Sequence, residues 1–283
     1  MRLDAHQHFW RYDPRRDTWI GDDMAVLKRD FLPEEFAREL AANGIDTSIA
    51  VQADQSEAET QFLLQLANDT PAIVGVVGWI DLRDPAVEKR LHFFSQFKKL
   101  CGFRHIVQAE SDDRFVLRSD FIRGVQALRA FHYAYDLLVY PRQLPAAIRL
   151  VEKLPEQRFV LNHIAKPDIR AGLLSPWREY IYELAASPNV YCKLSGLVTE
   201  ADWEKWRPQD CAPYLDVVFE AFGTRRLMFG SDWPVCLLAA NYAEVKDLVG
   251  DYVRQAAPGS SDAIFGENAA RFYGVKAVEW TCN

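Results

Sequence analysis

The sequence predicts an α/β protein that folds as one (β/α)8 barrel, the TIM-barrel architecture, across residues 1–283. Short apolar segments alternate with segments of helical periodicity, and strict alternation of this kind forces the strands to pair in parallel. Right-handed crossovers then allow an open doubly wound sheet or a closed barrel. Eight such units fit closure, and His8-Phe9-Trp10-Arg11 after the first strand is unlike the glycine-rich turn of a dinucleotide-binding sheet.

The predicted strands are apolar and rich in β-branched residues, as strands buried on both faces are. They cover residues 2–8, 46–52, 73–80, 102–107, 134–140, 158–163, 190–194 and 226–230. No change of composition or linker marks a second domain. The whole chain is therefore expected to form a single domain.

The predicted helices have an apolar face every three to four residues. They cover residues 32–44, 57–68, 85–97, 119–131, 144–154, 176–186, 210–222 and 242–252, and a short C-terminal helix is expected at 261–273. The first shows clear end signals. Pro33 lies in its first turn, where a missing N–H costs nothing, and Asn43-Gly44 is a typical helix stop.

Composition excludes several classes of partner. The formal net charge is −7, and no run of Lys and Arg offers a surface that could follow a phosphate backbone, so nucleic acid is not expected as a partner. No apolar run approaches the ~20 residues that span a bilayer, and the first strand starts too early to leave room for a signal peptide. The five cysteines are odd in number and widely spaced, which favours a reduced, cytoplasmic protein.

Two histidines, His6 and His8, lie one residue apart in the first predicted strand. Side chains at positions i and i+2 of a strand project from the same face, so both imidazoles point at one place. Imidazole is the commonest metal ligand, and its ring N–H is also a hydrogen-bond donor. The pair therefore indicates either two ligands of one metal ion or two donors to one oxygen atom.

Polar residues also end other predicted strands, where barrels of this kind carry their chemistry. The sixth strand ends at His163, and Asp232 follows the eighth. Taken singly, His163 fits a hydrogen-bonded core histidine and Asp232 fits a turn residue. Together with His6 and His8, they predict one catalytic or metal-binding set at the mouth of the barrel.

Five more side chains near strand ends are candidate contacts for a substrate. They are Arg104, Gln108, Trp79, Lys193 and Tyr140. The assignment leaves alternatives open, since a cation at a strand end often pairs with a nearby carboxylate and a tryptophan is equally often a core residue. His105 follows Arg104 directly, so it is expected to face the barrel wall and to be structural.

Four motifs carry a resemblance to a known family. They are Asp4-Ala5-His6-Gln7-His8, Asn162-His163, Gly230-Ser231-Asp232-Trp233-Pro234 and Gly266-Glu267-Asn268-Ala269-Ala270-Arg271-Phe272-Tyr273. They resemble the amidohydrolase superfamily, in the branch of small β/α-barrel lactonases related to amidohydrolase 2, and the likeness covers the whole chain. Segments 135–145 and 192–197 resemble sugar lactonases that act on fucono- or rhamnono-lactones, which implies a role in sugar catabolism.

The resemblance implies that His6, His8, His163 and Asp232 are the metal ligands if a metal is bound. Binuclear members carry a bridging Lys or Glu on the fourth strand, where this chain has Arg104, and many place a His on the fifth strand, where this chain has none. Two metals are therefore not expected. One Zn²⁺ or another divalent ion, or catalysis without metal, both remain open.

By the same analogy, the expected activity is hydrolysis of an aldonolactone, with Asp232 as general base. His6, His8 and His163 would either hold a zinc ion or donate to the carbonyl oxygen. Such barrels often form homodimers. The alternatives are a hydrolase of an aromatic ring-cleavage lactone and a metal-dependent decarboxylase on the same site. A ring-cleavage substrate carries several carboxylates and would need two or more convergent arginines, whereas Arg104 is the clear one here.

Overall fold

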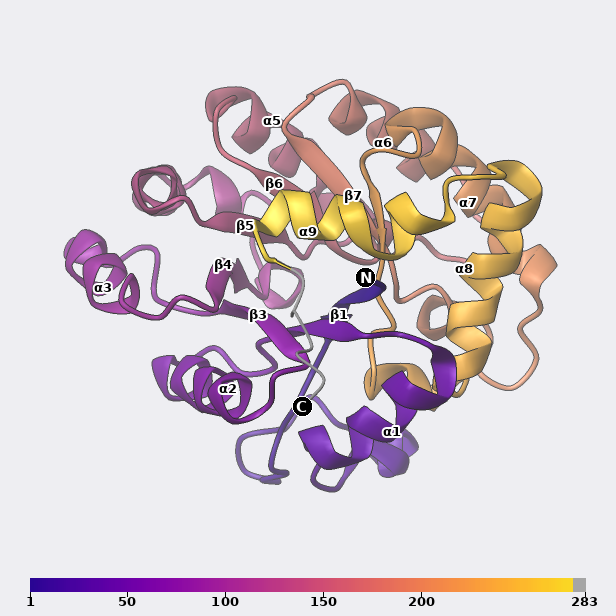
Figure 1. Ribbon diagram of the computed structural model, residues 1–283. Coiled ribbons are helices and arrows are strands. Elements are labelled where there is room, and N and C mark those ends of the chain that lie inside the picture. Colours follow the sequence, from indigo (N-terminus) through magenta and orange to yellow (C-terminus); the bar gives the residue numbers. More distant parts are fainter. Residues whose placement is uncertain (277–283) are drawn as a thin grey trace.

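The computed structural model describes residues 1–276 as one sheet of eight parallel strands, in chain order, ringed by helices (Figure 1). The strands are β1 (Leu3–Gln7), β2 (Thr47–Val51), β3 (Ile73–Gly78), β4 (Leu100–His105), β5 (Ala134–Leu137), β6 (Phe159–Leu161), β7 (Val190–Leu194) and β8 (Leu227–Phe229). A parallel bridge between Gln7 and Trp233 brings the end of β8 back beside β1. The predicted (β/α)8 barrel is confirmed.

Helices connect the strands on the outside of the barrel (Figure 1). They are α1 (Pro33–Asn43), α2 (Glu57–Asp69), α3 (Val87–Phe94), α4 (Ser119–Leu128), α5 (Leu144–Lys153), α6 (Trp177–Ala185), α7 (Pro208–Phe222), α8 (Tyr242–Ala256) and α9 (Asn268–Tyr273). A π-helical turn, Ala263–Glu267, leads directly into α9, within the segment expected to form the C-terminal helix.

The interior of the barrel is closed at one end by α9, which lies near the N-terminus (Figure 1). Ala269, Phe272 and Tyr273 of this helix pack against side chains from the strands, among them Leu3 and Met228. This end of the barrel is therefore filled by apolar side chains. The polar side chains collect at the opposite end, where the strands finish.

The barrel closes between β1 and β8, and we call this junction the seam. It is held together by hydrogen bonds to a buried carboxylate, that of Asp4. One oxygen of Asp4 accepts hydrogen bonds of 3.0 Å from the backbone N–H groups of His6 and Ser231, and the other accepts the hydroxyl of Tyr242 over 3.0 Å. The backbone N–H of Asp232 in turn donates to the carbonyl of His6 over 2.8 Å. The seam thus fixes the chain on both sides of the candidate site.

Seven of the eight strands end one to three residues earlier than the periodicity predicts, and only β7 ends where it was expected to. β5 stops at Leu137 rather than 140, and β6 stops at Leu161 rather than 163. After β6 the backbone enters the left-handed region at four consecutive residues, with φ of 53°, 48°, 62° and 50° from His163 to Lys166. Non-glycine residues rarely adopt this conformation, and such strain is concentrated at functional sites.

The described part of the chain holds four cysteines. Cys101, Cys192, Cys211 and Cys236 are free and buried, and Cys282 lies outside the described residues. Among residues 1–276, no helix is long and apolar enough to cross a bilayer.

A buried carboxylate in the first turn of α2 makes stability depend on pH. Burial raises the pKa of Glu59 from 4.5 to about 7, and its carboxylate accepts one backbone hydrogen bond, from Ala53. Between these two pH values the folded state holds a proton that the unfolded state has released, so the free energy of unfolding falls as pH rises. We expect a total loss of about 3 kcal/mol from this group.

Denaturant unfolding at several pH values checks this expectation. Glu59→Gln removes the titration, so the variant should lose less stability than the wild type between pH 4.5 and 7. Glu88→Gln, at an exposed position of α3, is the matched control and should behave like the wild type. Equal slopes for Glu59→Gln and the wild type would show that Glu59 does not titrate in this way.

Candidate active site

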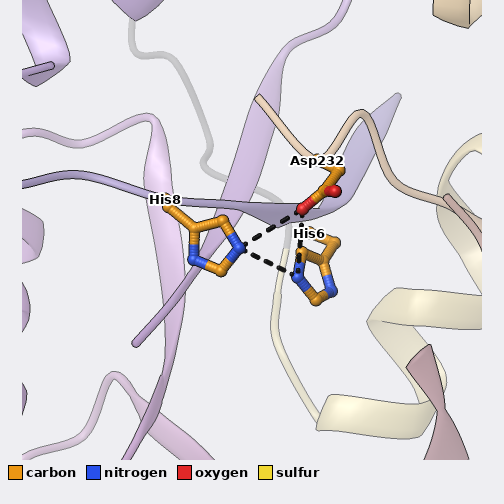
Figure 2. Close-up of side chains that lie close together, drawn as sticks. All are labelled: His6, His8 and Asp232. Atoms are coloured by element: carbon orange, nitrogen blue, oxygen red, sulfur yellow. Dashed lines mark hydrogen bonds and ion pairs between the residues drawn. The ribbon is translucent and has the colours of Figure 1, made fainter. Parts of the chain in front are cut away.

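The predicted pair of histidines and Asp232 converge at the carboxyl ends of β1 and β8 (Figure 2). The Nε2 atoms of His6 and His8 are 3.2 Å apart. One carboxylate oxygen of Asp232 lies 3.3 Å from Nε2 of His8 and 3.7 Å from Nε2 of His6. All three side chains are buried.

His163 joins this group from the turn that follows β6. Its Nε2 lies 3.8 Å from the same oxygen of Asp232, and its Nδ1 is within 2.9 Å of the hydroxyl of Ser195. The left-handed turn after β6 places His163 here, and the N–H of Lys166 closes the turn on the carbonyl of His163 over 2.7 Å. The structure therefore brings together all four members of the predicted catalytic set.

The protonation states follow from burial and from the neighbours. Burial, followed by the positive charge of Lys193, lowers the pKa of His6 well below its usual value, and burial does the same to His163. Burial alone would raise the pKa of Asp232, but its contacts with His163 and His8 and the charge of Lys166 outweigh burial and lower this pKa. At neutral pH the site therefore holds an ionised carboxylate among neutral imidazoles.

The donor set fits a divalent metal ion of the zinc type. His6, His8 and Asp232 each offer one ligand atom, and these atoms all lie within 4.8 Å of one another. Two imidazole nitrogens and a carboxylate oxygen are typical ligands of catalytic zinc, which keeps a further position open. His163 lies outside this compact group, beside the oxygen of Asp232.

A cavity of about 580 Å³ opens above these side chains. His8, His163 and Asp232 form part of its floor. The remaining walls come from the loops after the strands, including residues 10–24, 53–55, 138–140 and 199–203. A cavity of this size is typical of a small-molecule site.

Three of the five predicted substrate contacts line this cavity: Arg104, Gln108 and Tyr140. Arg104 is largely occupied by protein groups, since it donates to the backbone carbonyl of Gln52 and to the side-chain oxygen of Asn162. The side-chain oxygen of Gln108 is buried and has no protein partner. It is therefore free to accept a hydrogen bond from a bound molecule.

The other two predicted contacts do not reach the cavity. Lys193 is fully buried beneath the histidines, where its ammonium group lies 2.7 Å from Asp136 and 3.3 Å from Nδ1 of His6. The indole N–H of Trp79 donates to Nδ1 of His105 over 3.3 Å. His105 is buried in the barrel wall, as expected, and stacks on Phe115.

Several residues of the cavity were not predicted. Aromatic side chains come from the loops after β1 and β7, and charged or polar ones come from the loops after β2, β6 and β7. They are Trp10, Trp19, Trp203, Asp54, Gln55, Lys166 and Glu200. Lys166 and Glu200 form an ion pair of 2.8 Å, and although burial opposes it, the charge of Glu200 raises the pKa of Lys166.

Comparison with known proteins places this architecture in a family. The family model described as amidohydrolase matches residues 3–275. The chain belongs to the amidohydrolase family. It is 46% identical to an L-fucono-1,5-lactonase of Burkholderia multivorans over 284 residues, which cover 96% of each protein.

A solved structure at 45% identity agrees with this assignment. The chain superposes on a crystal structure of a Burkholderia multivorans amidohydrolase with bound zinc, at a TM-score of 0.94 and 45% identity, covering 98% of this chain and 100% of the other. A probable 2-pyrone-4,6-dicarboxylic acid hydrolase of Acinetobacter baumannii superposes at a TM-score of 0.76 with 15% identity, covering 96% of this chain and 99% of the other. That second likeness shows the shared fold alone.

Proposed function

We propose that this amidohydrolase hydrolyses a neutral aldonolactone, such as an L-fucono- or L-rhamnono-lactone, to the open-chain acid. The observation that carries the proposal is the charge of the cavity. The cavity is lined by three carboxylates, those of Asp54, Glu200 and Asp232. Only two cations, Arg104 and Lys166, line it as well. A substrate with several carboxylates of its own would be repelled there, whereas a neutral one would not.

The walls offer what a polyhydroxylated ring requires. Carboxylates such as Asp54 and Glu200 accept hydrogen bonds from hydroxyl groups, and Lys166 donates to them. Trp10, Trp19 and Trp203 supply apolar surfaces on which the C–H face of a sugar packs. The 46% identical L-fucono-1,5-lactonase supports the same class of substrate.

Hydrolysis of a lactone requires an activated water, a stabilised oxyanion and a proton for the leaving alkoxide. In the proposed mechanism Asp232, ionised at neutral pH, takes a proton from the attacking water. The imidazole N–H groups beside it donate to the carbonyl oxygen as negative charge develops, and such donors contribute about 3 kcal/mol each. Asp232 then returns the proton to the ring oxygen as the C–O bond breaks.

The same side chains also provide for a metal. His6, His8 and Asp232 would hold a zinc ion, and His163 lies beside the shared carboxylate oxygen. Zinc, when bound, supplies a Lewis acid for the carbonyl group and a bound water of lowered pKa. The structure of the 45% identical relative with bound zinc supports this fit.

A hydrolysis assay with a pH indicator, on a panel of aldonolactones, tests the proposal. We expect turnover of a fucono- or galactono-type lactone. Activity that survives chelation would assign the reaction to Asp232 and the imidazole donors, and activity lost on chelation and restored by Zn²⁺ would assign His6 and His8 as ligands. The absence of turnover on every lactone would overturn the proposal and favour the decarboxylase.

The ion pair of Lys166 and Glu200 predicts a specific effect on substrate binding. Glu200→Gln removes a charged acceptor for a hydroxyl, and a hydrogen bond to a charged group contributes about 1.5–3 kcal/mol. We expect kcat/KM to fall about tenfold, mainly through a higher KM. Glu204→Gln, at an exposed position of the same loop, should leave both constants within twofold. Equal values of kcat and KM for the two variants would show that Glu200 does not contact the substrate.

A further inference from the structure

The side chains around the cavity are divided by polarity. Polar and charged ones come from β4 and from the loops after β2, β4, β6 and β7. They are Asp54, Gln55, Arg104, Gln108, Lys166, Thr199 and Glu200. Apart from His8 and Asp232 at the floor, the described side chains that the loops after β1 and β8 contribute are Trp10, Trp19, Met24, Val235 and Leu238. One side of the cavity is therefore apolar.

Three of these side chains, Met24, Val235 and Leu238, form what we call the apolar wall. Met24 lies in a 3-10 turn, Asp22–Leu27, and the other two lie in a second 3-10 turn, Val235–Leu238. The two turns pack against each other. All three side chains are partly buried against the hydrophobic core and also line the cavity. The wall is therefore supported by the core beneath it.

The apolar wall begins beside the proposed base. Val235 comes three residues after Asp232, and the backbone N–H of Cys236 donates to the carbonyl of Asp232 over 2.9 Å. The same short stretch of chain thus carries the carboxylate at the floor and two side chains of the wall. A molecule that reaches Asp232 lies at the foot of the apolar wall.

The position of a lactone ring follows from the proposed function, on which this inference rests. In that mechanism Asp232 returns a proton to the ring oxygen, so the ring oxygen lies near Asp232 when the C–O bond breaks. The ring carbon bonded to this oxygen carries the exocyclic substituent of a lactone. The substituent therefore leaves the ring near Asp232, where the apolar wall begins.

We propose that the apolar wall is a subsite for this exocyclic substituent, and that the enzyme also hydrolyses lactones whose substituent is an alkyl chain. The bonds that change are those of the proposed reaction. The oxygen of water bonds to the carbonyl carbon, the ring C–O bond breaks, and the alkoxide takes up the proton that Asp232 removed from the water. Only the group carried by the ring differs.

The size of the cavity allows a longer substituent than the single methyl group of a 6-deoxy sugar. Its volume of about 580 Å³ lies within the range of about 300–1,000 Å³ that drug-sized ligands fill, and a six-carbon lactone is much smaller than such a ligand. Trp19 lies at the rim, where 44% of it is exposed and its ring packs edge-on against Trp10 at 5.9 Å between centroids. Its indole can cover the far end of a chain that follows the wall.

The chemistry of the wall favours a hydrocarbon over a second sugar. The side chains of Val235 and Leu238 offer a hydroxyl group no hydrogen-bond partner, and the thioether of Met24 is only a weak acceptor. A hydroxyl group buried against them would lose its bonds to water without replacement. An alkyl chain has no such bonds to lose and removes apolar surface from water.

A series of δ-lactones without hydroxyl groups tests the subsite. The members carry methyl, propyl or pentyl on the ring carbon bonded to the ring oxygen. We expect kcat/KM to rise about fourfold for each methylene group that the wall buries. Equal kcat/KM for the three lactones, or no turnover of any of them, would overturn the inference.

Leu238→Gln tests the place of the chain, because it puts an amide of similar size into the wall. We expect the gain for each methylene group to fall below about twofold, since the chain then meets less apolar surface. Leu173→Gln is the matched control. Leu173 is 57% exposed and lies outside the cavity lining, so this variant should keep the wild-type gain. The same gain in Leu238→Gln as in the wild type would show that the chain lies elsewhere.

Calorimetry with δ-lactams that carry the same three substituents gives a readout that does not depend on turnover, because the amide of a six-membered lactam resists hydrolysis. Their affinity should rise about fourfold for each methylene group. Equal affinities, or no binding, would contradict the subsite. Turnover of sugar lactones without a gain along the alkyl series would overturn this inference alone. A gain along both series without turnover of any sugar lactone would overturn the proposed sugar specificity alone.

Discussion

Asp232→Asn is expected to lower kcat about 10³-fold, because the amide cannot accept the proton of the attacking water. The amide has nearly the same shape as the carboxylate, and the backbone N–H of Asp232 still donates to His6. The fold should therefore be retained, as circular dichroism and thermal unfolding would show. The comparison requires initial rates at saturating lactone, where binding does not limit turnover.

Asp247→Asn is the matched control for this variant. Asp247 lies on α8, and 59% of its side chain is exposed, so its replacement should leave kcat within twofold. An Asp232→Asn protein that turned over at the wild-type rate would show that another group is the base. Asp232 would then be confined to binding a metal or orienting the histidines.

Gly196→Ala is expected to lower kcat/KM about 10²-fold by displacing His163, since small misplacements of a catalytic group cost this much. Gly196 has a φ of +64°, and an added Cβ would lie 2.7 Å from Nδ1 of His163 and 2.8 Å from its Cβ. The imidazole cannot stay in place, and its contact with Ser195 would be lost.

Gly172→Ala separates this effect from backbone strain. Gly172 has a similar φ of +69°, but an added Cβ would meet nothing within 4 Å. Both variants should lose about 1–2 kcal/mol of stability from the left-handed conformation, and only Gly196→Ala should lose activity. If the two variants had equal activity, the position of His163 would not matter for turnover.

The alternation of strands and helices was sufficient to predict the barrel, and the i, i+2 spacing was sufficient to predict that His6 and His8 lie together. Strand and helix alternation determines parallel pairing, and the carboxyl ends of parallel strands meet at one end of a barrel. The i, i+2 spacing of His6 and His8 then places both rings on one face, where the seam at Asp4 and Asp232 joins them. The spacing of the two histidines is local, and the pairing of the strands follows from their order along the chain. Both can therefore be read from the sequence.

Lys193 and Trp79 show what the sequence does not contain. A position near the end of a strand does not say whether a side chain rises into the cavity or packs below it. Lys193 forms an ion pair with Asp136, a residue of another strand, and this contact holds it beneath His6. Trp79 donates a hydrogen bond to His105, which holds its indole ring in the barrel wall. Both partners are distant in sequence, and no pattern along the chain indicates the pairing.

The walls of the cavity were unpredicted for a related reason. Trp19 and Glu200 belong to loops after the strands, which have no periodicity from which a direction can be read. Lys166 lies five residues beyond the end of β6 and reaches the cavity through a left-handed turn of non-glycine residues. None of these residues is a glycine, so the sequence gives no sign that the backbone adopts a left-handed turn there.

The most direct test of the proposed function is the ratio of kcat/KM for L-fucono-1,5-lactone to that for 2-pyrone-4,6-dicarboxylate, measured on one preparation. The first substrate is neutral and the second carries two carboxylates, so the ratio reports the charge preference of the cavity. We predict a ratio above 10³ in favour of the neutral lactone. Equal or better turnover of the dicarboxylate would contradict the proposal that the cavity selects a neutral sugar lactone.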